Sequence, residues 1–267
     1  MNADADAVAA EPVLLRQNEG GVVTLTLNRP AQSNSLSHAL MSALQTELDG
    51  IAADAGARVV ILAGAGKAFC AGHDLKEMRA NPAKAMQRVL FDQCSRLMLT
   101  LVRMPQPVIA RVHGIATAAG CQLVSMCDLA VASDNSRFAV SGVNLGLFCS
   151  TPSVGLARNL GRKQAMEMLL TGEFIDAPAA LARGLVNRVV PLAQLDEEVR
   201  KLTDSIVAKT PVAIRAGKQM FYRQLEMGLD EAYELASETM ACNMMADDAK
   251  EGIDAFIAKR QPRWRGH

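Results

Sequence analysis

The chain has 267 residues, half of them apolar, and carries 28 Lys and Arg against 28 Asp and Glu. This length and apolar content allow a substantial core, in one large domain or two small ones. The balanced charge argues against a nucleic-acid-binding protein and against a protein that works on an anionic membrane surface, because both need a basic excess. A phosphorylated small molecule is still a possible ligand, since a few cations and backbone N–H groups can hold it.

The cysteines and the beginning of the chain bear on metal binding and cellular location. Six cysteines lie scattered in mostly apolar runs, which predicts reduced, buried thiols rather than disulfides. Cys70 and His73 form a C-x-x-H motif without a second ligand pair, so we expect no metal site. Residues 1–12 match neither a signal peptide nor an Arg-rich transit peptide. No apolar stretch approaches the ~18 residues of a membrane span, and we expect a cytoplasmic protein without one.

After a loose start, the first part of the chain is typical of alternating strands and helices. Residues 22–27 (VVTLTL) are a β-branched run, and residues 58–63 (RVVILA) are a continuous apolar run, as in a strand covered on both faces. Residues 37–53 have leucines at four-residue spacing, which predicts an amphipathic helix. Residues 83–104 form a second long helix that ends at Pro105.

The same unit recurs further along the chain. A strand at residues 108–112, a loop of small residues at 114–119, a helix at 120–126 and a strand at 129–132 follow in order. Repeated strand–loop–helix units imply parallel pairing with right-handed crossovers.

The last hundred residues are mostly helical. We expect an α/β core, residues 12–200, followed by a helical region, residues 201–267, that packs on the core or on a neighbour. The pattern predicts helices at residues 163–170, 178–183, 195–208, 211–227 and 229–258, and a short strand near residues 186–190.

Two strand-to-helix junctions, residues 68–74 (AFCAGHD) and 113–123 (HGIATAAGCQL), place small residues where a strand ends and a helix begins. Such junctions leave backbone N–H groups unpaired at the positive end of a helix dipole. Two of these groups that converge make an oxyanion hole for a carbonyl oxygen. The alternative is that the glycines only permit tight turns.

The GAGK sequence at residues 64–67 is not a phosphate-binding loop, because Ile61 and Ala68 stand where that motif needs Gly and Ser or Thr.

Six segments, in order and over nearly the whole chain, resemble the enoyl-CoA hydratase/isomerase, or crotonase, superfamily. Cys149-Ser150-Thr151-Pro152 also makes the chain similar to a divergent branch, the enoyl-CoA hydratase domain-containing proteins. The resemblance implies a spiral of ββα units with a C-terminal helical region, assembled as trimers or hexamers. The segments are LNRPAQSNSL (27–36), AFCAGHDLKEM (68–78), HGIATAAGCQLVSMCDLAVAS (113–133), RFAVSGVNLGL (137–147), EMLLTGEFIDAPAALARGLVNRVVP (167–191) and EGIDAFIAKR (251–260).

The resemblance also implies an acyl-CoA thioester as the ligand, with coenzyme A as part of the substrate and no permanently bound cofactor. The backbone N–H groups of His73 and Ala119 match the oxyanion hole, with Ala119 where the family usually has glycine. Phe256 and Lys259 match positions that reach a neighbouring subunit's CoA, although Lys259 can equally be a solvated helix lysine. Asp74 is more typical of a helix N-cap than of a catalyst. The wall that accepts CoA is matched by Ser33, Ser35, Asp74, Leu75 and Lys76.

Both glutamates with which family hydratases add water are missing. Gln122 stands in place of the first and Gly142 in place of the second. A glutamine amide can hold a water molecule but cannot accept a proton near neutral pH. General acid–base help contributes ~10²–10⁴-fold per group, against ~10²–10³-fold for an oxyanion donor. We therefore expect classical hydration to be weak or absent.

Other chemical groups near these positions leave two hypotheses open. Ser150 stands about where dehalogenating relatives have a nucleophilic aspartate, and Cys149 is either a nucleophile or an inert buried thiol. The ring of His73 has either a catalytic or a structural role. One hypothesis is an enzyme that holds an enolate in the oxyanion hole, assisted by water, Gln122, Asn144 or His73. The other is a non-catalytic acyl-CoA-binding or scaffold protein.

Overall fold

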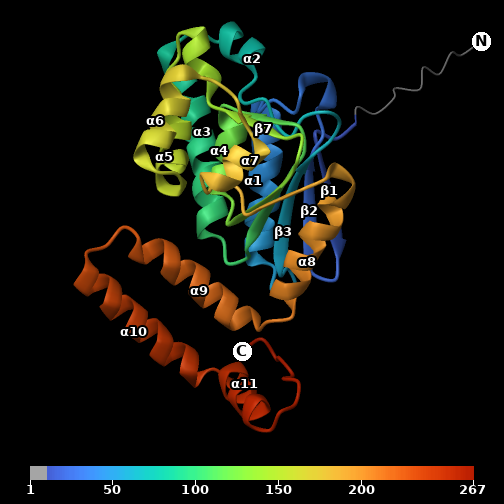
Figure 1. Ribbon diagram of the computed structural model, residues 1–267, viewed down its shortest axis with the longest axis vertical. Coiled ribbons are helices and arrows are strands. Elements are labelled where there is room, and N and C mark those ends of the chain that lie inside the picture. Colours follow the sequence, from blue (N-terminus) through green and yellow to red (C-terminus); the bar gives the residue numbers. More distant parts are fainter. Residues whose placement is uncertain (1–10) are drawn as a thin grey trace, which may run out of the picture.

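The computed structural model describes residues 11–267, and a sheet of mostly parallel strands lies at its centre (Figure 1). The strand order is β1-β2-β3-β4-β6-β9, and a smaller sheet has the order β5-β7-β8. In the large sheet β1 and β2 pair antiparallel, and every later neighbour pairs parallel. The strands are β1 (Leu14–Glu19), β2 (Val22–Leu27), β3 (Val59–Gly64), β4 (Val108–Val112), β5 (Ile115–Thr117), β6 (Leu129–Ser133), β7 (Arg137–Ala139), β8 (Ile175–Asp176) and β9 (Arg188–Val190).

Helices cover both faces of the large sheet, and the apolar side chains on both sides of its central strands are buried beneath them. On one face Val60 packs in a core with α1, α3 and α4, and on the other face Val59 packs with Leu195 of α8. This arrangement confirms the prediction of a strand covered on both faces. The helices of the core are α1 (His38–Ala53), α2 (Leu75–Ala80), α3 (Lys84–Arg103), α4 (Ala119–Met126), α5 (Ser150–Asn159), α6 (Arg162–Thr171), α7 (Ala177–Ala182) and α8 (Leu195–Val207).

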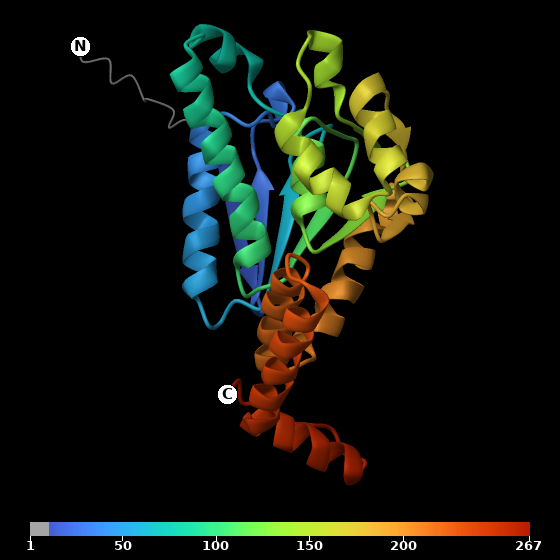
Figure 2. The same ribbon diagram turned by 90° about the vertical axis from the view of Figure 1, so that its left-hand side faces the viewer.

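Three further helices, α9 (Pro211–Gln224), α10 (Leu229–Met245) and α11 (Asp247–Ile257), extend from one end of the core (Figures 1 and 2). A buried lysine of α9 anchors them. The Lys218 ammonium donates to the carbonyl oxygens of Leu101 and Gln106, each at 2.8 Å, and to the Asp128 carboxylate at 2.7 Å. The Tyr222 hydroxyl donates to the same carboxylate at 2.9 Å.

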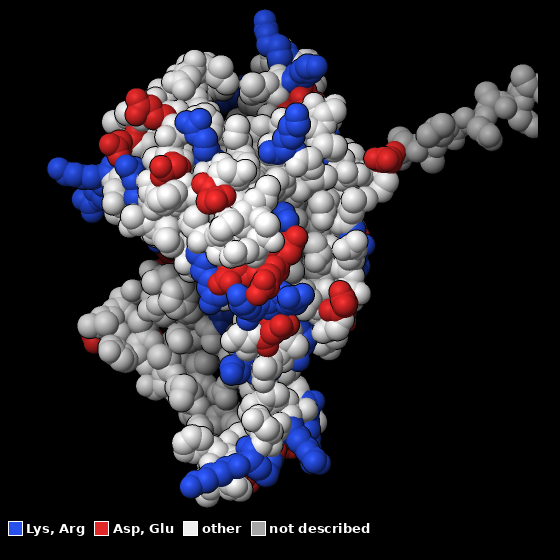
Figure 3. Space-filling model, turned by 45° about the vertical axis from the view of Figure 1, so that its right-hand side comes forward, with Lys and Arg blue, Asp and Glu red and all other residues white. Residues whose placement is uncertain are grey.

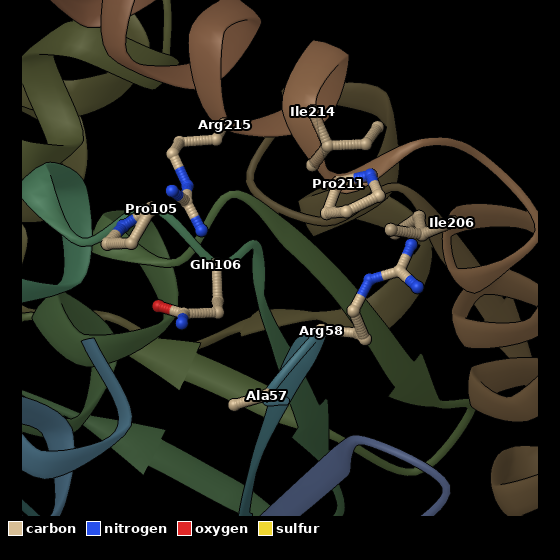
Figure 4. Close-up of a pocket in the computed structure, with 8 residues that line it drawn as sticks. All are labelled: Ala57, Arg58, Pro105, Gln106, Ile206, Pro211, Ile214 and Arg215. Atoms are coloured by element: carbon tan, nitrogen blue, oxygen red, sulfur yellow. The ribbon is translucent and has the colours of Figure 1, made fainter. Parts of the chain in front are cut away.

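A small pocket marks the junction between the core and α9 (Figure 4). The Arg58 guanidinium donates there to the carbonyl oxygens of Val207 at 3.2 Å and Lys209 at 2.6 Å. The junction lies beside the beginning of β3, at the opposite end of that strand from the loop that leads to α2. The pocket is lined by Ala57, Arg58, Pro105, Gln106, Ile206, Pro211, Ile214 and Arg215.

The predicted helix at residues 229–258 is wrong as a single element, because Ala246 adopts an extended conformation between α10 and α11. The cause lies two residues on, in the buried carboxylate of Asp248. It accepts hydrogen bonds from the Thr210 hydroxyl at 2.5 Å and from the backbone N–H groups of Arg265 at 2.6 Å and Gly266 at 3.0 Å. These bonds fold the chain end back onto the beginning of α9 and turn α11 away from α10.

The other predicted elements are confirmed to within a few residues of their ends. α5 and the strands β1, β5, β7 and β8 were not expected, and β5 lies inside the loop predicted at residues 114–119. All six cysteines are free thiols, and five of them are buried, whereas Cys242 is exposed. The expected domain boundary at residues 200 and 201 falls inside α8 and stays a prediction.

The outer surface carries charges of both signs. On the face in Figure 3, basic and acidic side chains intermingle, as the balanced composition requires. One such cluster joins Lys201 and Arg188 to Glu198 at 3.1 and 2.7 Å. From residue 11 onward, no helix has the length and apolar content that a bilayer crossing requires.

Candidate functional site

The first candidate loop presents the backbone N–H of His73. Leu36 holds the chain on both sides of this residue: its N–H donates to the Gly72 carbonyl at 2.7 Å, and its carbonyl accepts from the Asp74 N–H at 3.1 Å. Between these two bonds, the N–H of His73 has no acceptor among residues 11–267. The loop therefore leaves a backbone donor free, as an oxyanion hole requires.

Asp74, the next residue, begins α2 as its N-cap. One carboxylate oxygen accepts from the N–H groups of Lys76 at 3.1 Å and Glu77 at 3.4 Å, and the other accepts from the Arg29 guanidinium at 2.9 Å. Partial burial acts to raise the pKa of Asp74, but these hydrogen bonds outweigh it and lower the pKa below its usual value. The N-cap interpretation is confirmed, and Arg29 is a residue that the sequence argument missed, although it lies in the LNRP segment.

The second candidate loop presents the N–H of Ala119. Ala118 has φ +50° and ψ −121°, a conformation that L residues rarely adopt. Its N–H donates to the Ala139 carbonyl at 2.9 Å, and its carbonyl accepts from the Gln122 N–H at 3.0 Å. The Ala119 N–H, at the first residue of α4, has no acceptor in the described part of the chain. It therefore points out from the positive end of the α4 dipole.

The two loops lie against each other. A Cβ atom added to Gly72 (φ +92°) would lie 2.8 Å from the Ala118 Cβ and 3.3 Å from the Ala119 nitrogen. A Cβ at Gly120 would lie only 2.1 Å from the Cys70 carbonyl oxygen. Gly120 thus allows close approach of the backbones, while Gly72 also provides a left-handed turn. The glycines therefore do more than permit tight turns, because they let the loops that carry these two N–H groups approach each other.

Gln122 and Gly142, the two positions at which the resemblance leads us to expect glutamates, differ in what they can hold. Gln122 is 3% exposed, and its Oε1 has no hydrogen-bond partner within the described residues. Gly142 lies in a short 3-10 segment, η2 (Ser141–Leu145), whose Ser141 hydroxyl is 3.0 Å from the Thr117 hydroxyl of the second loop. The Gly142 N–H donates to the Cys149 sulfur at 3.3 Å. Both positions therefore flank the second loop, without a carboxylate at either.

The titratable side chains near the loops are held neutral by burial. Neither ring nitrogen of His73 forms a hydrogen bond of good geometry within residues 11–267, although the Leu36 backbone lies near enough to act on the pKa of the ring, which packs edge-on against Phe91 with centroids 5.4 Å apart. Burial lowers the pKa of His73 to about 4. Burial likewise raises the pKa of Cys121 to about 12 and raises that of Cys149. Near pH 7 these groups are a neutral imidazole and two thiols.

The residues expected to accept CoA fall into two groups. Arg29 links the first group, since its guanidinium donates to the Ser35 carbonyl at 2.6 Å as well as to Asp74. The structure thus brings Ser33 and Ser35 beside the segment of Asp74, Leu75 and Lys76. The second group, Phe256 and Lys259, lies at α11 and just beyond it, at the opposite end of the molecule from α2 (Figure 1). Within one chain the structure does not bring Phe256 and Lys259 to the loops.

Close relatives contradict the prediction of a cytoplasmic location. A protein of Xenopus laevis, named enoyl-CoA hydratase domain-containing protein 3, mitochondrial, is 46% identical over 95% of this chain and 86% of its own length. The human protein of that name is 44% identical over 95% of this chain and 83% of its own. The prediction of a cytoplasmic protein is therefore wrong by this comparison. It rested on residues 1–12, of which 1–10 lie outside the described residues, and on the lack of a long apolar stretch in the sequence.

Solved structures share the architecture described above. The crystal structure of human enoyl-CoA hydratase domain-containing protein 3 superposes with a TM-score of 0.92, over 94% of this chain and all of that one. The crystal structure of an enoyl-CoA hydratase of Mycobacterium smegmatis has a TM-score of 0.94 and 58% identity, over 95% of this chain and 99% of that one. Residues 17–267 match the family model described as enoyl-CoA hydratase/isomerase. The chain belongs to the enoyl-CoA hydratase/isomerase family and has its crotonase fold.

Proposed function

We propose that this protein binds acyl-CoA thioesters and holds the thioester carbonyl between the backbone N–H groups of His73 and Ala119. One observation supports the proposal: two N–H groups without acceptors among the described residues lie on loops that approach each other so closely that a Cβ on Gly72 would lie 3.3 Å from the Ala119 nitrogen. Fixed backbone donors at a helix N-terminus stabilise negative charge that develops on a carbonyl oxygen. The same pair would polarise a ground-state thioester and stabilise an enolate.

CoA itself would lie along the segments joined by Arg29. Support comes from the two bonds that fix this wall, from Arg29 to Ser35 and from Arg29 to Asp74. Leu75 and Lys76 follow directly and are exposed to solvent. CoA enters as part of the substrate, and we propose no permanently bound cofactor and no metal.

Hydration of enoyl-CoA is proposed to be several powers of ten slower than in a relative with two glutamates. A hydratase needs a group that accepts a proton from water, and a group that exchanges one at the α-carbon. Gln122 and Gly142 provide neither, and the low pKa of His73 makes its imidazole a poor base at pH 7. This loss favours either another enolate reaction, with water, Gln122, Asn144 or His73 assisting, or binding without turnover.

We further propose a trimer, or a dimer of trimers, in which the helical region contacts a neighbouring subunit. Support comes from large apolar side chains that stay exposed on it: Leu229 is 73% exposed, Tyr233 68% and Phe256 86%. Exposed apolar clusters of this kind mark interaction surfaces. Phe256 and Lys259 would then reach the CoA of the neighbour. Light scattering that reports a stable monomer at micromolar concentration would refute this assembly.

Calorimetry and isotope-edited infrared spectroscopy with butanoyl-CoA test the carbonyl site directly. We expect butanoyl-CoA to bind and its thioester C=O stretch to move to lower frequency. Ala119→Pro removes the donor at the first residue of α4 and should abolish the shift, and circular dichroism checks that this buried position still folds. Lys84→Pro, at the first residue of α3, is the matched control and should keep it. Absence of any acyl-CoA binding, or an unshifted carbonyl in the wild type, would contradict the proposal.

Turnover is tested separately, with enoyl-, β-keto-, malonyl- and saturated acyl-CoAs. We expect crotonyl-CoA to be hydrated far below rates typical of enzymes, ~10 s⁻¹. Hydration at or above that rate would mean that another residue supplies the proton chemistry. Turnover of another thioester would favour the enzyme hypothesis, and binding without any turnover would favour the scaffold hypothesis.

A further inference from the structure

The direction of the His73 N–H is fixed by the residue that bonds to Gly72. The carbonyl of Gly72 and the N–H of His73 belong to one planar peptide group and point in opposite directions. Because the Gly72 carbonyl accepts from the Leu36 N–H at 2.7 Å, the His73 N–H points away from Leu36. The Ala71 N–H likewise donates to the Ser33 carbonyl at 3.0 Å, so the same segment holds two successive residues of the first loop. Whatever positions Leu36 therefore also aims the donor of this loop.

Leu36 follows a tight turn, residues 29–35, that Asn34 closes. The Asn34 N–H donates to the Arg29 carbonyl at 2.9 Å, and the Asn34 Oδ1 accepts from the Arg29 N–H, also at 2.9 Å. Ser33 and Asn34 have φ values of +51° and +55°, in the left-handed region that residues other than glycine rarely adopt. Asparagine tolerates this region better than most residues, and its reciprocal bonds with Arg29 offset the backbone strain.

The Asn34 side chain also joins this turn to the first loop. Its Nδ2 donates to the carbonyl oxygens of Ala65 at 2.8 Å and Ala68 at 2.7 Å, so both hydrogens of the amide are used. Asn34 is completely buried. Gly64 provides the space for it, because an added Cβ there would lie 2.9 Å from the Asn34 Nδ2. One amide therefore ties the turn to the beginning of the loop whose end carries the donor.

We propose that Asn34 is the positioning residue of the oxyanion hole, which holds the turn against the first loop and so aims the His73 N–H at the thioester carbonyl. This inference rests on the proposed acyl-CoA site and deepens it. Since Asn34 is completely buried, it contacts no ligand and acts only through the backbone. The second donor, the N–H of Ala119, does not depend on Asn34, because its direction is fixed within the second loop and α4.

Infrared spectroscopy of bound butanoyl-CoA separates this role from an effect on stability. Asn34→Gly removes the amide but keeps a residue that adopts positive φ without strain. We expect it to halve the shift of the thioester C=O stretch, because one donor of two is misdirected. Calorimetry should show about ten-fold weaker binding of butanoyl-CoA, as the loss of one hydrogen bond produces.

Gln106→Ala is the matched control. Gln106 is 4% exposed, and its amide also donates to two backbone carbonyls, those of Ile51 at 2.8 Å and Asp54 at 3.2 Å. It lies beside the beginning of β3, far from the first loop. Urea unfolding should show a loss of stability similar to that of Asn34→Gly, whereas the C=O shift and the affinity for butanoyl-CoA should stay unchanged.

Asn34→Asp decides the question if circular dichroism shows that Asn34→Gly does not fold. The aspartate still accepts from the Arg29 N–H, but its second oxygen cannot donate to Ala65 and Ala68, so the C=O shift should fall in the same way. An unchanged shift in either folded variant would overturn this inference and leave the proposed site intact. Unfolding of both variants, or an equal loss of the shift in Gln106→Ala, would also overturn it. An unshifted carbonyl in the wild type would overturn the proposed site itself.

Discussion

The backbone N–H of Gly142 donates to the sulfur of Cys149 at 3.3 Å, so the thiol lies against the backbone of the η2 segment. A Cβ atom at position 142 would lie 2.7 Å from that sulfur and 2.5 Å from the carbonyl oxygen of Leu147. The second neighbour is backbone, which cannot move aside as a flexible side chain can. Glycine at this position is therefore required by packing and not by its backbone dihedral angles.

The first prediction is that Gly142→Ala destabilises the fold, because even one methyl group overlaps the Leu147 carbonyl. Overpacking of this kind costs about 1–3 kcal/mol, measured as the free energy of unfolding in urea. Gly50→Ala is the matched control: an added Cβ there meets nothing within 4 Å. As an interior residue of α1 it should gain up to about 1 kcal/mol. Equal stability of wild type and Gly142→Ala would show that the η2 segment yields easily.

The second prediction concerns restoration of the missing carboxylates. Gln122→Glu combined with Gly142→Glu should give a less stable protein rather than a good hydratase, because the clash at position 142 remains. Gln122→Glu alone should raise crotonyl-CoA hydration by no more than one acid–base group supplies, about 10²–10⁴-fold. Circular dichroism and hydration rates on the same samples separate the two effects. A stable, active double variant would contradict the steric argument.

The third prediction concerns Ala118, whose φ of +50° and ψ of −121° fall where glycine is favoured. Backbone strain of this kind costs about 1–3 kcal/mol, and the extra freedom of glycine in the unfolded chain offsets part of the gain. Ala118→Gly should therefore raise the free energy of unfolding by about 1 kcal/mol. Ala116→Gly, in the neighbouring strand β5, should lower it instead. A loss of stability in both variants would mean that the Ala118 methyl contact with Gly72 outweighs the strain.

Local sequence patterns predicted the elements that position the site. The leucines at four-residue spacing in α1 indicate which face of the helix is buried, and the continuous apolar run of β3 indicates that both faces of the strand are buried. The two loops were predictable for a related reason, because small residues between a strand and a helix leave backbone donors free.

Features that depend on contacts between distant residues could not be read from local patterns. The break at Ala246 has no proline or glycine to mark it, and follows from the bonds of Asp248 to the chain end. The steric role of Gly142 depends on Cys149, seven residues later, whose thiol shows no signal in sequence. Arg29 was missed because its partner Asp74 is 45 residues away.

The fourth prediction is that Asp74→Ala destabilises the protein by about 2 kcal/mol, since it removes an N-cap and leaves Arg29 without its carboxylate. Asp74→Asn keeps the cap and should lose less. Because folding lowers the pKa of Asp74, its stabilisation is present above the unfolded value near 4 and is lost as the pH falls below it. Asp92→Ala, which breaks the exposed pair with Arg88, is the control and should cost less than about 0.5 kcal/mol.

The fifth prediction concerns the pH dependence that the His73 ring creates. Burial lowers its pKa from 6.5 to about 4, so the unfolded chain binds a proton on this ring at a higher pH than the folded protein does. Stability from this group is therefore complete above pH 6.5 and falls as the pH is lowered toward 4. At 1.36 kcal/mol per pKa unit, the loss over this range amounts to about 3 kcal/mol.

Urea unfolding between pH 7.5 and 4.5 gives the free energy of unfolding of the wild type and of His73→Phe as a function of pH. The difference between these two curves is the contribution of the His73 ring. Parallel curves would mean that the ring takes up its proton at the same pH in the folded and the unfolded chain, so that burial does not hold it neutral.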